Sequence, residues 1–277
     1  PVWAIAAPAP VGPSSLSTVG GAWNDGFQIQ NLDPTHDANV IISYWLPDGT
    51  RAAADQVDVI PANGSKTYYR ATMDVPEGFD GSVTVESDRR VAVIANQTSG
   101  NPTLAGSYNA LSGGATKLFL PLVMRDNRGW NTKYYVQNLG DSTTYLTMEY
   151  IQGSKPVLTQ TASLAPRASL RADQTEMGQL PTPWVGSVVL SAGAPIAAVV
   201  NESNDAVLMS YAGLTTGATR LHAPLVMNDN SGWFTGLQVQ NVGDEATVVT
   251  LRVDSAAVAS ETLAHGVTAA LKPKHLP

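Results

Sequence analysis

Residues whose side chains could do chemistry are few in this sequence and are spread along it. The four histidines do not fall in an HExxH or HxH spacing of the kind that metal sites use; they are His36, His222, His265 and His275. No Gly-x-Ser-x-Gly nucleophile motif, Walker motif or Rossmann glycine motif occurs. We therefore interpret the histidines as scattered surface or strand residues. We expect a protein that is not an enzyme and that needs no cofactor.

One repeated loop carries side chains that could hold a cation. The sequence RDNRG at residues 125–129 recurs as NDNSG at residues 228–232. Calcium prefers oxygen ligands from Asp, Asn and backbone carbonyls, so the calcium candidates are Asp126, Asn127, Asp229 and Asn230. The same pattern is also ordinary hairpin sequence, because Asn and Gly tolerate positive φ. Turn formation is the simpler interpretation.

Aromatic and asparagine side chains suggest two further kinds of site. Trp45 and Trp184 are candidates for exposed residues that stack on a ligand such as a sugar ring. The recurring Trp23, Trp130 and Trp233 are instead interpreted as covers for the ends of hydrophobic cores. The acceptor triplet for N-glycans begins at three positions, which are Asn63, Asn96 and Asn201.

These residues belong to a long internal repeat. The stretch LFLPLVMRDNRGWNTKYYVQNLGD at residues 118–141 recurs as LHAPLVMNDNSGWFTGLQVQNVGD at residues 221–244, and in shortened form around Trp23. The three aligned tryptophans are 107 and 103 residues apart, which is the size of a small domain (about 100 residues) rather than of a solenoid repeat. We predict three tandem units, at residues 1–113, 114–216 and 217–277. The paired Gln-Asn of each unit is interpreted as a structural cap.

The pattern within each unit indicates strands. In unit 2, short apolar or alternating segments recur, separated by Gly, Asn, Asp and Ser, and Leu146, Met148 and Tyr150 are predicted to face inward. Seven or eight such strands are typical of a β-sandwich. The predicted fold class is all-β, with tandem immunoglobulin-like β-sandwich domains. Residues 256–271 have helical propensity, but the aligned segment of unit 2 contains two prolines, so a strand is predicted there too.

The third unit is predicted to be incomplete. It stops where unit 2 still has about three strands to come, from residue 186 onward. Half a sandwich would expose its core face, so we expect either a piece of a longer protein or another chain that supplies strands. The apolar residues 1–11 are predicted to form a strand that exchanges between copies, with Val2, Trp3, Ile5 and Val11 as assembly residues. The start at Pro1 is consistent with removal of a signal peptide.

Composition excludes several classes of function. Charged residues make up only 14% of the 277 residues and the net charge is −7, with no basic run of the kind that nucleic-acid binding requires. The absence of cysteine excludes disulfides and thiolate metal sites. No apolar run reaches the roughly 18 residues that a membrane span needs.

The repeat resembles one that occurs in secreted and surface proteins of filamentous bacteria. The phrases that carry the resemblance are P-L-V-M, G-W-x-T, V-Q-N-x-G-D, G-S-V-V and P-I-A-A-V-V-N, at residues 121–124, 129–132, 136–141, 186–189 and 195–201. The resemblance implies a β-sandwich fold and an extracellular or cell-surface location, and it carries over no catalytic residues.

The interpretation that fits these observations is a non-catalytic structural protein. Tandem sandwiches with short junctions and low charge suit a subunit of a filament, sheath or surface layer, whose partners are other copies of itself. The alternative is a cell-surface adhesin or an array of carbohydrate-binding modules, whose partners would be cell-wall or surface glycans.

Overall fold

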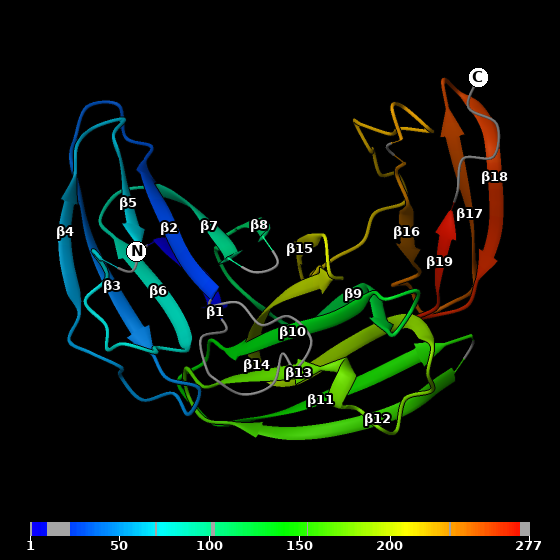
Figure 1. Ribbon diagram of the computed structural model, residues 1–277, viewed down its shortest axis with the longest axis horizontal. Coiled ribbons are helices and arrows are strands. Elements are labelled where there is room, and N and C mark those ends of the chain that lie inside the picture. Colours follow the sequence, from blue (N-terminus) through cyan, green and yellow to red (C-terminus); the bar gives the residue numbers. More distant parts are fainter. Residues whose placement is uncertain are drawn as a thin grey trace.

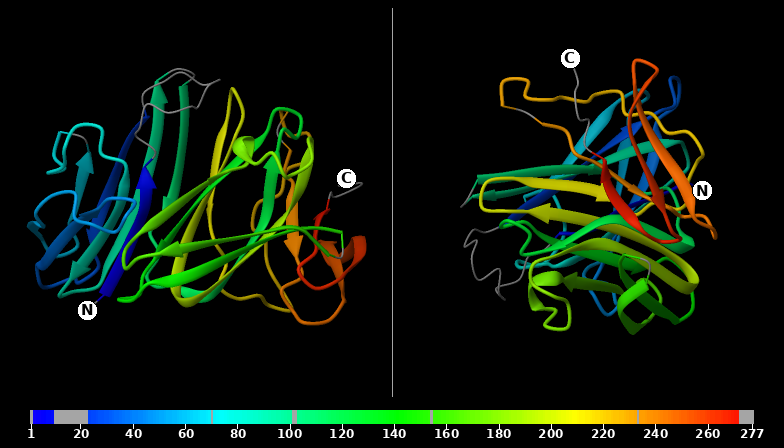
Figure 2. Two further views of the ribbon diagram at one scale, coloured as in Figure 1. Left: turned by 90° about the horizontal axis from the view of Figure 1, so that it is seen from below. Right: turned by 90° about the vertical axis from the view of Figure 1, so that its right-hand side faces the viewer.

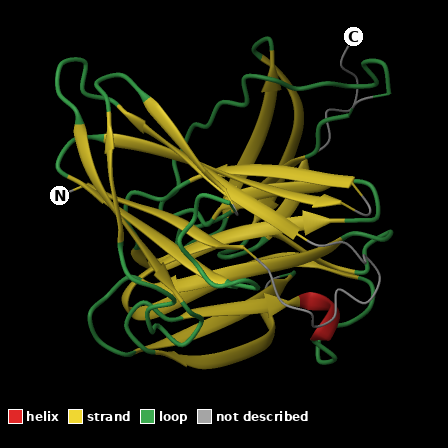
Figure 3. Cartoon of the chain, turned by 60° about the vertical axis from the view of Figure 1, so that its left-hand side comes forward, coloured by secondary structure: helices red, strands yellow, loops and turns green. Residues whose placement is uncertain are grey.

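The regular secondary structure of the described residues is almost entirely antiparallel β-strand (Figures 1 and 3). The computed structural model describes residues 2–9, 23–69, 71–100, 103–153, 155–232 and 234–271. Within these ranges the helical structure is one short 3-10 turn, η1 (Gln174–Glu176). No helix in the described part of the chain has the length and apolarity needed to cross a membrane. The all-β fold class is thereby confirmed.

Unit 1 consists of eight strands in two four-stranded sheets that face each other across a core. The first sheet has the order β1 (Val2–Ala9), β6 (Gly81–Ser87), β3 (Ala38–Trp45) and β4 (Gln56–Ile60). The second has the order β5 (Ser65–Tyr69), β2 (Trp23–Asn31), β7 (Val91–Gly100) and β8 (Thr103–Asn109). Buried side chains of both sheets form one cluster, to which Ile29 of β2 and Ile42 of β3 contribute. This arrangement is that of a β-sandwich.

Unit 2 repeats this pairing order with one difference, which is that a single long strand runs through both layers. The first half of β14 (Trp184–Ser203) pairs with β9 (Ala115–Arg125) and β11 (Thr144–Gln152). The second half pairs with β10 (Asn131–Asn138) and β15 (Leu208–Ala212). The outer strands are β12 (Lys155–Leu164) and β13 (Ser169–Asp173). β14 therefore corresponds to β6 and β7 of unit 1 joined into one strand.

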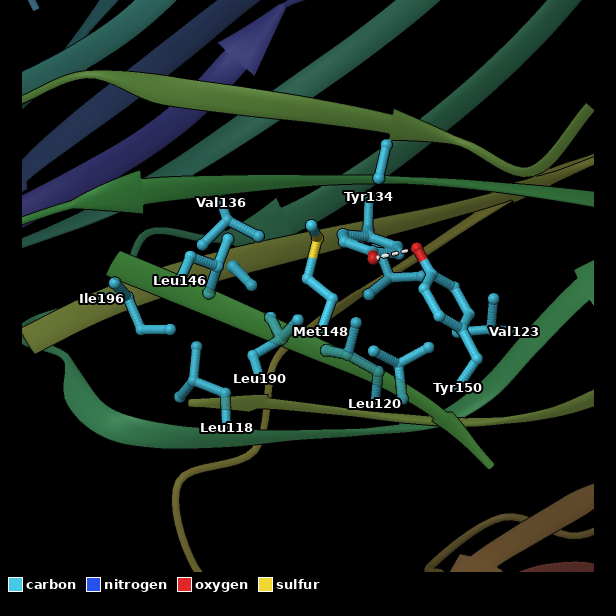
Figure 4. Close-up of a cluster of buried hydrophobic side chains, with 14 of the residues drawn as sticks. Leu118, Leu120, Val123, Tyr134, Val136, Leu146, Met148, Tyr150, Leu190 and Ile196 are labelled. Atoms are coloured by element: carbon cyan, nitrogen blue, oxygen red, sulfur yellow. Dashed lines mark hydrogen bonds between the residues drawn. The ribbon is translucent and has the colours of Figure 1, made fainter. Parts of the chain in front are cut away.

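The core of unit 2 lies between the two halves of β14 (Figure 4). Leu190 and Ile196, on either side of the bend, belong to the same buried cluster. Leu146, Met148 and Tyr150 are 0%, 4% and 0% exposed, which confirms the predicted inward face of β11. The hydroxyls of Tyr134 and Tyr150 are hydrogen-bonded at 2.5 Å, so these buried polar groups satisfy each other.

The N-terminal strand has the place in unit 1 that the P-L-V-M strand has in unit 2. Along β6, Ala6 is opposite Val83 and Ala9 is opposite Gly81, with a register shift between them. Along β14, Leu120 is opposite Val188 and Val123 is opposite Gly186, with the same shift. β1 is therefore the counterpart of β9, although its sequence fits the P-L-V-M phrase poorly.

In the described residues of the third unit, the strands form two pairs, which can be found by their labels in Figure 1 and are drawn from other sides in Figure 2. β16 (Leu237–Gln240) pairs with β19 (Thr268–Leu271), and β17 (Thr247–Val253) pairs with β18 (Ala256–Leu263). The strand prediction for residues 256–271 is confirmed by β18 and β19. Residues 221–227, the second P-L-V-M phrase, form no strand.

Candidate interface between the units

Each unit carries the same asparagine-centred cap at the end of its β2-type strand. Asn138 is fully buried, and its Nδ2 donates to the carbonyls of Ser142, Leu164 and Ala165 at 2.8, 3.1 and 3.0 Å. Its Oδ1 accepts from the amide of Gly140 at 2.9 Å. Asn31 and Asn241 make the corresponding bonds in units 1 and 3. The cap predicted for the Gln-Asn pairs is confirmed for the asparagines.

The glutamine before the capping asparagine of unit 2 has a different task, which is contact with unit 1. Gln137 of unit 2 is 2% exposed, and its Nε2 donates to Ser82 Oγ of unit 1 at 2.5 Å and to the carbonyl of Arg167 at 3.1 Å. Ser82 stands in the Gly-Ser-Val phrase of β6. The Gly-Ser-Val strand of unit 1 thus docks on the capped end of unit 2.

The junction between units 2 and 3 uses the same positions. Gln240 Nε2 donates to the carbonyl of Gly266 at 3.1 Å, and Ser187 Oγ of unit 2 donates to that carbonyl at 2.7 Å. Ser187 is the counterpart of Ser82, and Gly266 is the counterpart of Arg167. Arg167 and Gly266 both have a positive φ, 63° and 73°, and in both turns the carbonyl accepts from the glutamine of the same cap.

A second contact is also repeated. A Cβ placed on Gly114 would be 2.8 Å from Leu139 Cδ1, and one placed on Gly217 would be 2.3 Å from Val242 Cγ2. Both glycines are the first residues of their units, and both apolar partners follow the capping asparagine. At the second junction Val242 and Val267 also pack on a buried cluster of unit 2, made by Phe119, Ile151 and Val189. The segments that join the units, at Gly114 and Gly217, are therefore packed against the caps.

Sequence reasoning missed two buried acidic residues that lie in different units. Asp25 of β2 lies opposite Gln97 of β7, and at the matching place in unit 2 Thr132 lies opposite Glu202. Burial raises the pKa of Asp25 to about 7 and that of Glu202 to about 8. Glu202 is 3% exposed. The only indication of this site in the sequence was that Asn96-Gln97-Thr98 aligns with Asn201-Glu202-Ser203. This alignment does not show that the side chains are buried.

Glu202→Gln is expected to stabilise unit 2 at pH 8. An acid whose pKa is raised in the folded chain keeps its proton when folded and loses it on unfolding, so the free energy of unfolding falls as pH rises from about 4.5 to about 8. Glutamine, which unit 1 already has at this place, removes that loss. We expect a gain on the order of 2–4 kcal/mol at pH 8 that vanishes near pH 4, measured by urea unfolding across this range. The exposed Glu261→Gln serves as the control, and equal curves for all three proteins would contradict the assignment.

The structure corrects the expected role of one tryptophan. Trp184 is 1% exposed and belongs to the core of unit 2, so the prediction that it is an exposed stacking residue is wrong. Trp45 is half-buried, its Nε1 donates to Thr84 Oγ1 at 3.0 Å, and the guanidinium of Arg51 lies 4.1 Å from the ring centroid. Trp130 is half-buried at a hairpin turn. The side chain of Trp23 and all of Trp233 lie outside the described residues.

The calcium candidates lie in tight turns. Asn127 and Trp130 exchange two backbone hydrogen bonds of 3.0 Å around Arg128 and Gly129. Positive φ falls on Asp126, Arg128 and Gly129, and again on Asp229, Ser231 and Gly232, rather than on Asn127 and Asn230. Among the described residues no group of three or more His, Asp or Glu side chains could hold a metal ion. The loops serve as hairpin turns.

The remaining predicted sites differ in accessibility. Asn63 and Asn96 are exposed, but Asn201 is 7% exposed and accepts from Ser210 Oγ at 2.8 Å, so the glycosylation prediction at Asn201 is wrong. The predicted assembly residues Val2, Trp3 and Ile5 lie in β1, which here pairs with β6 of its own chain. Val11 and His275 lie outside the described residues, and His36 and His222 are exposed in different units.

Comparisons with known proteins add little. The chain matches no known protein family and no curated protein. A solved structure described as the crystal structure of Thermotoga maritima 1070 is similar over 36% of this chain and 93% of that chain, with 22% sequence identity and a TM-score of 0.32. A likeness of that size carries no conclusion about this chain, so its function has to be argued from the junctions.

Proposed function

We propose that this chain is a non-catalytic structural protein of the cell exterior, a subunit of a filament, sheath or surface layer. Its tandem immunoglobulin-like sandwiches would associate head to tail with further units of the same kind. The observation that carries the proposal is the use of one contact at both junctions, namely Ser82 with Gln137 and Ser187 with the turn that Gln240 binds. A contact between two different surfaces propagates instead of closing.

The capped end of unit 1 keeps the docking features. Gln30 is exposed at the position of Gln137 and Gln240, and Leu32 is 44% exposed at the position of Leu139 and Val242. Asn63 has a φ of 55° at the position of Arg167. The Gly-Ser-Val strand of a further unit would fit this cap as it fits the other two. Exchange of β1 between copies stays a prediction. In such an exchange, β1 of one copy would pair with β6 of another copy instead of with β6 of its own chain.

Most of the aromatic residues on which the adhesin alternative depends are not free to stack on a ligand. Of the four that the sequence offers, Trp184 and Tyr68 are each 1% exposed, and Arg51 covers a face of Trp45. Tyr69 is 53% exposed. We therefore place the structural role first.

The proposal predicts that Leu32→Glu prevents assembly. A carboxylate on the free cap would have to be desolvated in the junction, which is costly. Electron microscopy and sedimentation at neutral pH should show linear assemblies of the unchanged protein and of Ile41→Glu, a residue that is 40% exposed away from the cap. Leu32→Glu should sediment as a monomer. An unchanged protein that stays monomeric at every concentration would contradict the proposed role.

A further inference from the structure

One edge strand of unit 2 is long and almost free of charge. In the described part of the chain β12 has β11 as its one strand neighbour, so the backbone groups on its other side are not paired with a strand. β12 is the lowest strand in Figure 1. From residue 156 to residue 164 its sequence is PVLTQTASL, which contains no charged side chain. A long, flat edge of this kind is a template for pairing with another strand.

The corresponding edges of units 1 and 3 are protected. β4 of unit 1 has only five residues, and its Asp58 binds Lys66 Nζ of β5 at 2.5 Å. β18 of unit 3 carries the exposed Glu261. Short strands and charged side chains are two of the devices that keep sheet edges from pairing. β12 has ten residues, and its one charged residue, Lys155, is the first of them.

The irregular part of β12 is confined to the same end. Tyr150 is opposite Leu158 and Ile151 is opposite Pro156, so the register with β11 shifts at Val157. Prolines and bulges oppose edge pairing, and here both lie before residue 158. Residues 158–164, LTQTASL, pair with β11 without a shift. This stretch is the regular part of the edge.

The regular stretch is complementary to a second copy of itself. In an antiparallel pair with its two-fold axis at Thr161, Thr161 is opposite the same residue of the second copy, and Thr159 is opposite Ser163. These side chains are exposed, and Thr–Thr and Thr–Ser pairs across strands are favourable. On the other face the half-buried Leu158 would meet Leu164, which belongs to the core of unit 2. No charged side chains are brought together.

We propose that the β12 edge pairs with the β12 edge of a second copy of this chain, so that two sheets join into one. The contact uses the same surface on both copies and therefore closes on two. It is lateral, and it is separate from the head-to-tail contact of the proposed function. One short edge pairs weakly between free chains, but many edges along two linear assemblies would act together.

Thr161→Cys tests the pairing, because the chain contains no cysteine of its own. In the proposed register the two thiols are directly opposite, with Cα atoms about 4.5–5.5 Å apart, which is within the range that a disulfide spans. Mild oxidation of the folded protein should therefore link two chains through residue 161, as seen on a non-reducing gel. Urea added before the oxidation should prevent the link.

Thr147→Cys is the matched control, since Thr147 lies opposite Thr161 on β11 and on the same face of the sheet. In the joined sheet two residues at this position would be three strand spacings apart, about 14 Å, which is too far for a disulfide. We expect at least about tenfold more linked dimer from Thr161→Cys than from Thr147→Cys, because only the first geometry can form the bond. Gln160→Lys, added to Thr161→Cys, places a charge on the inward side of the edge and should lower the yield by more than about fivefold.

All of these variants are compared in chains that also carry Leu32→Glu, so that head-to-tail assembly does not contribute and the two proposals fail separately. The proposal is overturned if Thr161→Cys gives no more linked dimer than Thr147→Cys. It is also overturned if Gln160→Lys leaves the yield unchanged, since the link would then come from random collision.

Discussion

Trp184→Ala is expected to lower the free energy of unfolding of unit 2 by about 3–5 kcal/mol. The side chain is 1% exposed, and its ring meets Tyr150 edge-on, with centroids 6.0 Å apart and an interplanar angle of 65°. Gly186 provides the space that the ring fills. Removal of the indole would leave a cavity at the end of the core where β9, β11 and β14 meet. Urea unfolding followed by circular dichroism measures the change.

Trp130→Ala is the matched control, since Trp130 is half-buried at the β9–β10 hairpin. A loss of about 1 kcal/mol is expected from this substitution, the typical cost of a point mutation. If the two variants lose equal stability, or if Trp130→Ala loses more, the assignment of Trp184 to the core is contradicted.

Asn138→Ala is expected to cost about 3–4 kcal/mol. Three carbonyls and one amide lose their partner when the side chain is removed, and a buried polar group left unpaired costs about 1–3 kcal/mol. Asn138→Asp should be no better, because a carboxylate cannot donate to the three carbonyls. Thermal unfolding at neutral pH measures both.

The control for this prediction is another asparagine that caps a turn. Asn204 Oδ1 accepts from the amides of Ala206 and Val207 in an exposed turn, so water can replace the side chain. Asn204→Ala should cost about 1 kcal/mol or less. A similar loss from both substitutions would show that the buried hydrogen bonds of Asn138 contribute no more stability than those of an exposed turn.

Much of the architecture could be predicted from the sequence because it depends on local patterns that are repeated. Alternation identified the inward face of β11, and the comparison of units 2 and 3 identified β18 and β19 as strands despite their helical propensity. Positive φ at Gly129 and Gly232 follows from the same local chemistry, whereas positive φ at Arg128 and Ser231 does not.

Burial at the ends of the units could not be predicted in this way. Trp184 is in register with the buried Val188 and Leu190 of its own strand, but it follows a Pro and is separated from them by Gly186. Its place in the core therefore depends on the space at Gly186 and on the ring of Tyr150 in a neighbouring strand. Asn201 and Glu202 are likewise buried by contacts that are distant in sequence. The contact of Gln137 with Ser82 joins residues 55 positions apart, and no periodicity shows which unit a side chain will face.

The two P-L-V-M phrases show how far identical sequence fails to determine structure. Residues 121–124 are strand and residues 224–227 are not. The difference lies in the partner, since β9 has β14 beside it. Whether a segment forms a strand depends on a neighbouring strand that supplies its hydrogen-bond partners, and not on propensity alone.

Hydrogen–deuterium exchange of these two segments, followed by mass spectrometry, tests the central claim that pairing with β14 holds the P-L-V-M phrase of unit 2 in a strand. In the protein alone, amides of residues 118–124 should be strongly protected and those of residues 221–227 should exchange almost as fast as in an unfolded chain. Equal protection of both segments in the protein alone would contradict the account.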